Sequence, residues 1–200
     1  MTEIAGADVV VVDTSAVVNF AKAGALRPFH DYLKANAVIT ADVFGELEEW
    51  ARTNSAVAWL LKQAPWSQPM GLSPELQQKV IDILGFVEKL GEKAALQDVG
   101  EVTCVVLAQD LRDSGQAQPV LLLDDIRHGK NLAKPRGLDV VDTPGLIVEM
   151  VVAGAITKPL GGKVWRATFS DRSKWAGYDA RLADAGLDEQ KWCLVARPPR

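Results

Sequence analysis

Acidic residues end four apolar stretches of this 200-residue chain. They are Asp13 after VVVV, Glu46 in VITADVFGE, Glu101 in LQDVGE, and the adjacent Asp124 and Asp125 after VLLL. A buried strand that ends on a carboxylate brings that charge to one edge of a sheet, where the acids of parallel strands meet. Carboxylates that lie this close repel one another unless a cation lies among them. The pattern therefore predicts a divalent-metal site suited to phosphodiester chemistry.

Two of these acids have a clear alternative role that must be weighed against metal binding. Asp13 could cap the helix that follows it, although a buried strand end gains nothing from a bare carboxylate. Glu46 could face water, but at 100° per residue it lies beside the apolar face of its predicted helix. We expect both to bind metal, and we expect the hydroxyls of Thr14 and Ser15 to hydrogen-bond a ligand carboxylate or a phosphate.

Two further positions stay open between neighbouring acids. Asp98 and Glu101 form a D-x-x-E pair at a helix start, an arrangement that can also serve only as a capping box. We expect Glu101 to be the ligand, with Asp98 as a cap or an indirect support. Asp124 and Asp125 send their side chains in different directions, so one of them is expected to enter the site, and the sequence does not choose between them.

Short apolar runs alternate with helical patterns from residue 9 to residue 153. Strands are predicted at 9–12, 38–40, 120–123 and 140–141, and helices at 14–25, 43–51, 56–62, 73–87, 102–108 and 143–153. Strands that alternate with helices form a parallel sheet covered on both faces, and ligands bind beyond the carboxyl ends of its strands. Asp13 and Asp124 lie at those ends.

The periodicity fades after residue 157. Residues 158–162 are predicted to form a linker, 164–169 an edge strand and 178–185 a short helix. Residues 157–200 hold nine Lys or Arg and five Asp or Glu, a net charge of +4, so residues 1–156 carry the remaining −8. The basic, tryptophan-containing end could contact RNA. We favour the other interpretation, in which its aromatic residues pack on the preceding domain or on a partner.

Composition excludes several classes of protein. The chain shows no targeting segment, and its most apolar late stretch, 146–156, is too short for a membrane span and contains Glu149. Its two cysteines are far apart and lack the spacing of a metal or redox motif. We therefore expect a cytoplasmic protein with reduced thiols and no membrane association.

The order of these motifs resembles the PIN-domain family and, within it, the VapC-type toxins. VVVVDTS, VITADVFGEL, LQDVGEVTCVVLA and VLLLDDIRHGKNLA match the four motifs of the family, which places its acids at Asp13, Glu46, Glu101 and Asp124 or Asp125. The resemblance covers roughly residues 8–156. The third motif has Glu where Asp is commoner, and residues 157–200 exceed what a minimal toxin needs.

The resemblance implies an α/β fold with a three-layer α/β/α sandwich around a mostly parallel sheet, a PIN-like nuclease domain at 1–156 and a C-terminal extension at 157–200. It also implies cleavage of single-stranded or structured RNA with one or two Mg²⁺ or Mn²⁺ ions, a small antitoxin partner and a homodimer. Arg127, Lys130 and Arg136 are the residues expected to hold the RNA backbone.

Two rival functions remain. A phosphoaspartyl hydrolase would use the acid after the first strand as its nucleophile, but it needs a second acid two residues later, where this chain has Ser15. The alternative that we keep is a non-catalytic PIN-like module that binds RNA or protein, against which the retained acids argue.

Overall fold

The structure, a computed structural model, describes residues 4, 7–33, 36–89, 99–124, 129–169 and 171–186. Its strands are β1 (Val9–Val12), β2 (Ala37–Val38), β3 (Pro119–Leu122) and β4 (Asp139–Val141). They form one sheet in the order β2-β1-β3-β4, and every pairing is parallel. The parallel sheet that the sequence predicts is therefore confirmed.

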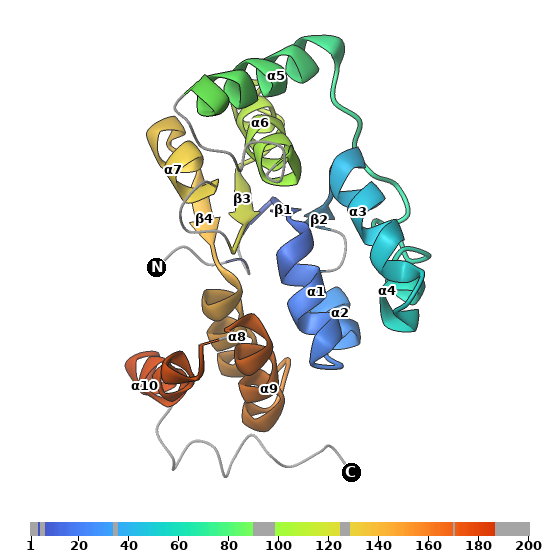
Figure 1. The fold of residues 1–200 in the computed structure, drawn as a ribbon. Helices are drawn as coiled ribbons and strands as arrows, with labels where there is room; N and C mark the ends of the chain where they lie inside the picture. Colours follow the sequence, from blue (N-terminus) through green and yellow to red (C-terminus); the bar gives the residue numbers. More distant parts are fainter. Residues whose placement is uncertain are drawn as a thin grey trace.

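Helices cover both faces of this sheet. They are α1 (Thr14–Lys22), α2 (Leu26–Leu33), α3 (Ala41–Ala51), α4 (Ser55–Leu60), α5 (Pro74–Lys89), α6 (Val99–Asp113), α7 (Gly129–Ala133), α8 (Thr143–Val152), α9 (Lys158–Thr168) and α10 (Gly177–Asp184), with 3₁₀ segments η2 (Lys134–Arg136) and η3 (Arg172–Ala176). In Figure 1, α5, α6 and α7 lie on one side of the sheet and α1, α2, α8 and α9 on the other. The fold class is α/β with three layers, as expected.

The two central strands are apolar at every position because both of their faces are covered. Val10, Val11 and Val12 of β1 are fully buried, and so are Leu121 and Leu122 of β3. A strand that is buried on both faces has no solvent-facing positions, so its sequence shows no alternation.

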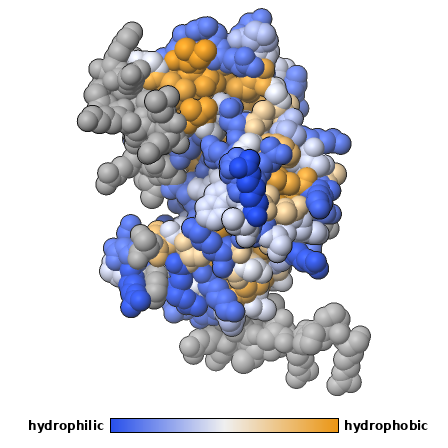
Figure 2. Space-filling view, turned by 45° about the vertical axis from the view of Figure 1, so that its right-hand side comes forward, coloured by the Kyte–Doolittle hydropathy of each residue, from blue (hydrophilic) through white to orange (hydrophobic). Residues whose placement is uncertain are grey.

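Helix α6 is apolar on every side because it fills the space between the sheet and α5. One side of α6 contacts β1 and β3 of the sheet. On its other side Val102 and Val106 pack against Leu76 and Val80 of α5. Figure 2 shows that apolar surface remains at the end of the molecule that α5 forms, where Ile81 is 59% exposed.

The first helix is shorter than predicted. Helix α1 ends at Lys22, and the chain turns at Gly24, whose φ of +70° lies in the left-handed region that favours glycine. A new helix, α2, then begins at Leu26. The prediction of one helix over 14–25 is wrong because the local apolar pattern continues across this turn.

The predictions of a linker at 158–162 and an edge strand at 164–169 are also wrong, because both segments lie in helix α9. The side chain of Thr157 accepts a hydrogen bond from Leu160 N–H, and Pro159 lies in the first turn, where its missing N–H costs nothing. Gly161 lies where α9 approaches α8 and α10, since a Cβ there would overlap the Tyr178 hydroxyl. The glycines that suggested a linker therefore permit close packing.

Aromatic residues attach this C-terminal region to the domain. Trp165 is 4% exposed and Tyr178 is 7% exposed, and both belong to the main core cluster. Helix α9 contacts α1 and α8. Both side chains are therefore part of the core that the sheet and its helices form. Within the described ranges, none of the helices has both the length and the apolarity that a bilayer span requires.

Substitution of Gly161 by Ala is expected to destabilise the fold. The added methyl group would overlap the Tyr178 hydroxyl, which donates to Lys158 O, and would lie 2.8 Å from a methyl group of Val151. Overpacking of this kind costs about 1–3 kcal/mol, or about 2–12 °C in Tm for a protein of this size. Thermal unfolding followed by circular dichroism measures the change.

The matched control is Gly45→Ala in α3, where nothing lies within 4 Å of an added Cβ. This variant is expected to gain about 0.5–1 kcal/mol, because alanine loses less backbone entropy in a helix. An equal or higher Tm for Gly161→Ala would show that α10 does not pack against α9 as described.

Candidate active site

Asp13 lies where β1 ends and α1 begins. Its backbone N–H donates to Leu122 O (3.1 Å), which ties it to the carboxyl end of β3. Its carboxylate caps α1, accepting from the N–H of Ser15 (3.1 Å) and from the Ser15 hydroxyl (2.6 Å). The side chain is 5% exposed. The N-terminus of a helix favours a negative charge, so this buried carboxylate is both hydrogen-bonded and placed in a favourable field.

Glu46 lies in the second turn of α3 and faces α1. The hydroxyl of Thr14 donates a hydrogen bond to its Oε2. Partial burial raises the pKa of the Glu46 carboxyl, the Thr14 hydrogen bond opposes that rise, and the charges of Asp13 and Asp42 add to it. Asp13 and Glu46 are therefore close enough to repel each other, and each has a neighbouring hydroxyl as hydrogen-bond donor.

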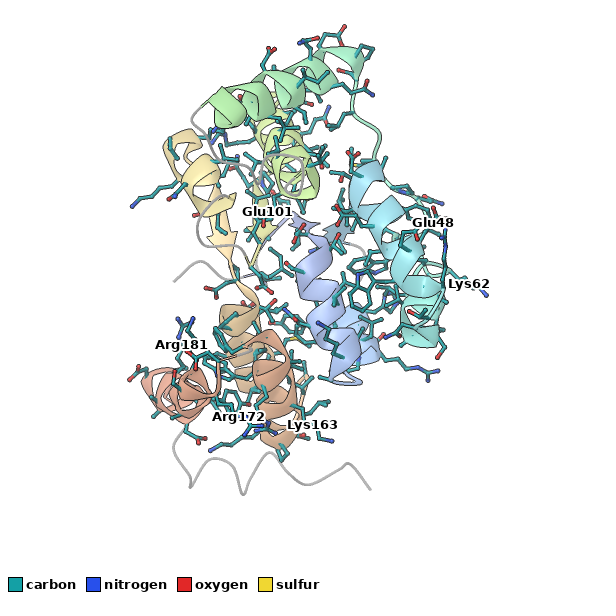
Figure 3. All side chains as sticks on the ribbon, in the orientation of Figure 1. Glu48, Lys62, Glu101, Lys163, Arg172 and Arg181 are labelled. Carbon is teal, nitrogen blue, oxygen red and sulfur yellow. The ribbon has the colours of Figure 1, made fainter. Side chains whose placement is uncertain are left out.

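Glu101 lies in the first turn of α6 and is 9% exposed. Figure 3 shows it at the end of α6 that faces α1. The residue before it lies against Glu46, because a Cβ at Gly100 would lie 2.9 Å from Glu46 Oε1. A larger residue there would displace the Glu46 carboxylate, which is the end of a flexible side chain. Gly100 is thus part of the site, and the sequence analysis missed it.

Two buried threonines hold the starts of α3 and α6 together. The Thr40 side chain caps α3 by accepting from Val43 N–H. Thr40 Oγ1 lies 3.1 Å from Thr103 Oγ1, and the Thr103 hydroxyl donates to Gly100 O (2.8 Å). The Thr40 hydroxyl must therefore be the donor to Thr103. This chain of hydrogen bonds places the helix turns that carry Glu46 and Glu101 next to each other.

These three acids line one open pocket of about 290 Å³. Its wall is formed by Asp13, Thr14, Ser15, Val18, Glu46, Trp50, Gly100 and Glu101. The acids come from three distant segments of the chain. Among the described residues, however, no three acidic, histidine or cysteine side chains converge closely enough to hold one metal ion. The pocket gathers the carboxylates on its wall, with Asp13 and Glu46 turned toward neighbouring hydroxyls.

Cys104 lies beneath this pocket in the core. Its Sγ is 3.8 Å from Val12 O, and its side chain is fully buried. Burial raises the pKa of the Cys104 thiol well above its usual value, and the charges of Asp13, Glu101 and Glu46 raise it further. Cys104 therefore remains a neutral thiol that packs under the acids.

Asp124 follows β3 at the same edge of the sheet, but it does not line the pocket. Its Oδ1 accepts from Thr143 N–H (2.7 Å), and its Oδ2 accepts from the Thr143 hydroxyl (2.8 Å) and from Asn19 Nδ2 (2.7 Å). Burial raises the pKa of Asp124, these hydrogen bonds oppose the rise, and Asp13 adds to it. Asp124 thus ties α1 and α8 to the sheet beside Asp13, and its role as a metal ligand stays a prediction.

The remaining predicted site residues have no described side chain near the pocket. Asp98, Asp125 and Arg127 lie outside the described residues, and only the backbone of Lys130 is described. Arg136 donates to Gln109 Oε1 and to Leu132 O, near the end of α6 opposite Glu101. Eight residues of helix separate Glu101 from Gln109, a rise of about 12 Å. Arg136 therefore anchors η2 to α6, at a distance from the acids.

The sequence matches a known protein family. A family model described as a PIN domain matches residues 9–161. No curated protein and no solved structure gives a significant match. The matched range begins at the first residue of β1, ends within α9, and includes the acids of the pocket.

Replacing Glu46 with Gln is expected to raise stability at neutral pH in metal-free buffer. Because the pKa of Glu46 is raised in the fold, its ionised form costs stability above that pKa. Gln removes the charge and still accepts the Thr14 hydrogen bond. The gain should be below about 1 kcal/mol, since water reaches this partly buried side chain and screens its charge. It should vanish as the pH falls below 4.5, where both side chains are neutral.

Chemical denaturation at pH 7 and at acidic pH measures this difference. Glu48→Gln is the matched control, because Glu48 is an exposed acid of the same helix that Figure 3 shows on the side away from Glu101. A loss of stability in Glu46→Gln at pH 7 would contradict the repulsion that we assign to the pocket.

Proposed function

Because this chain belongs to the PIN-domain family, whose fold is that of nucleases, we propose that it is a divalent-metal-dependent ribonuclease. The observation that carries the proposal is that Asp13, Glu46 and Glu101, from the end of β1, from α3 and from α6, line one pocket. An acidic pocket has no affinity for a polyanionic strand unless a cation offsets its charge. The pairing of such a pocket with a nuclease fold therefore indicates metal-assisted hydrolysis.

The donors in the pocket fit a hard cation. Mg²⁺ and Mn²⁺ prefer carboxylate and hydroxyl oxygens, and among the residues that the structure describes neither histidine nor cysteine lines the pocket. Asp13, Glu46 and Glu101 would hold the cation, and Asp124 or Asp125 could supply a further ligand. A bound ion of this kind lowers the pKa of water and offsets the charge of a phosphodiester.

The residues around the pocket orient the side chains that would bind the cation. Ser15 and the start of α1 hold the Asp13 carboxylate in one orientation, so Asp13 is a preorganised ligand. Glu46 is more exposed and is held by the single Thr14 hydroxyl, so it can turn toward the centre of the pocket at little cost. The hydroxyl of Thr14 then remains at the wall, where it can donate to a phosphate oxygen, while the Ser15 hydroxyl stays bonded to Asp13.

The substrate that we propose is single-stranded or structured RNA, and the motif resemblance to VapC-type toxins extends the proposal to a toxin with a small antitoxin. Incubation with defined single-stranded RNA, single-stranded DNA and hairpin RNA in Mg²⁺ separates these substrate classes. Co-purification with the product of an adjacent small reading frame, together with growth arrest on expression, tests the toxin role. If the protein cleaves RNA but its expression does not arrest growth, the nuclease proposal stands and the toxin role is rejected.

One observation favours a second candidate, a non-catalytic module that binds RNA or protein. Within the described part of the chain, the acids do not converge on one ion position. Titration calorimetry with Mn²⁺ discriminates between the two functions, because a module without a metal site releases no binding heat.

Asp13→Asn is expected to reduce Mg²⁺-dependent RNA cleavage by at least about 100-fold, the order of effect for removing one preorganised charge contact. The fold should persist, because Asn caps a helix about as well as Asp and can still accept from Ser15 N–H. Rates are measured on a fluorescent single-stranded RNA, with Glu48→Gln as the control acid. Wild-type rates in Asp13→Asn would remove Asp13 from the site.

Metal is expected to stabilise the folded protein. Mn²⁺ at about ten times its Kd adds about 1.4 kcal/mol of stability, which raises the Tm by about 3–6 °C for a protein of this size. Excess EDTA should reverse the shift, and Asp13→Asn should abolish it. An unchanged Tm in wild type would favour the non-catalytic module.

A further inference from the structure

Trp50 is an aromatic residue in the acidic pocket. It lies in the last turns of α3, lines the pocket together with the three acids, and is 38% exposed. Val43 and Leu47 of the same helix are fully buried. The apolar pattern of α3 groups Trp50 with these two residues, yet the structure leaves part of its ring open to the pocket.

The pocket extends between two neighbouring helices. Along α1, Thr14, Val18 and Lys22 follow one another at intervals of four residues and so share one face. On α3, Glu46 and Trp50 have the same spacing, and Trp50 is displaced from Glu46 by one turn, or about 6 Å along the axis. Thr14 bonds Glu46 at one end of this face, and Lys22 Nζ lies 5.4 Å from the centre of the Trp50 ring near the other end.

Charge therefore changes sign between the acids of the pocket and Lys22 beside it. The acids would hold the scissile phosphate through a cation. Trp50 stands one helical turn from Glu46, and the exposed Lys22 stands about two turns from Thr14, next to the Trp50 ring. A nucleotide next to the scissile phosphate can be bound by an aromatic ring that stacks on its base and by a cation that pairs with its phosphate.

We propose that Trp50 stacks on a base of the RNA strand beside the scissile phosphate and that Lys22 binds the adjacent backbone phosphate. The inference rests on the proposed ribonuclease function and names how that site holds its substrate. Since every base has a π-face, this contact accepts any sequence and requires an unpaired base. The contact therefore favours a single strand over a paired one.

The chain offers a matched control in Trp59 of α4. The guanidinium carbon of Arg27 lies 5.3 Å from the centre of the Trp59 ring, so this is also a tryptophan–cation pair, but it lies outside the pocket. Its ring makes an edge contact with His30, 5.4 Å between ring centres. Trp59→Leu removes the same chemistry at a place where no strand is proposed to bind.

The experiment uses single-stranded RNA oligonucleotides in which 2-aminopurine replaces one base at a time, with the full-length protein in Ca²⁺ buffer. Stacking on an indole quenches 2-aminopurine, so one position in the wild-type complex should be quenched. Trp50→Leu should lose that quenching and weaken binding about 5- to 150-fold, the range for one stacked base. Trp50→Phe should recover most of the affinity, and Trp59→Leu should bind as wild type does.

Lys22→Gln should weaken binding and reduce the slope of log Kd against log[salt] by about 1, as expected for one lost phosphate contact. Thermal unfolding of each variant confirms that the binding assays use folded protein. Equal quenching and equal affinity in Trp50→Leu and wild type would overturn the proposal.

Failure of this inference is distinguishable from failure of the nuclease proposal. If the wild-type protein cleaves RNA in Mg²⁺ and Trp50→Leu binds RNA with wild-type affinity, the stacking contact is rejected and the nuclease proposal stands. If quenching depends on Trp50 but no RNA is cleaved, the stacking contact stands and the pocket is an RNA-binding site without nuclease activity.

Discussion

Repulsion between carboxylates is the interaction on which the rest of this structure depends. Asp13, Glu46 and Glu101 line one pocket, and the fold brings them there against their mutual repulsion. Covalent and packing constraints overcome that repulsion. β1 delivers Asp13 to the sheet edge, the Thr40–Thr103 hydrogen bond joins the starts of α3 and α6, and the missing side chain at Gly100 leaves space for the Glu46 carboxylate beside α6. A protein with no use for the crowding would gain stability by losing one of these acids.

Local hydrogen bonds limit the cost of this arrangement. Ser15 donates to Asp13, Thr14 donates to Glu46, and Thr143 and Asn19 donate to Asp124. Thr14, Ser15 and Thr143 lie at the starts of the helices that follow the strands, and Asn19 lies further along α1. The raised pKa of Glu46 and of Asp124 shows that the compensation is incomplete, since burial outweighs the hydrogen bonds at both residues. A bound dication would complete it, which is why the pocket and the PIN-domain fold point to the same chemistry.

Glycine and aromatic residues have different structural roles at different positions of this chain. Gly24 provides a turn with positive φ, whereas Gly100 and Gly161 provide room for another side chain. Trp165 is part of the core, and Trp50 remains partly open to the pocket. Among the glycines, and between the two tryptophans, the residue type is the same and the neighbouring residues differ. The sequence analysis therefore predicted a linker where α9 forms.

The sequence by itself determined the parallel α/β fold, the order of its elements and the acids worth considering, because strand and helix periodicity and the position of an acid at a strand end are local properties of the chain. Only the tertiary structure decided that Glu46 and Glu101 share a wall with Asp13, that Asp124 is bonded to Thr143 beside that wall, and that Arg136 anchors the far end of α6. These outcomes depend on how closely segments remote in sequence approach one another. That distance is set by packing across the sheet, and no local pattern records it.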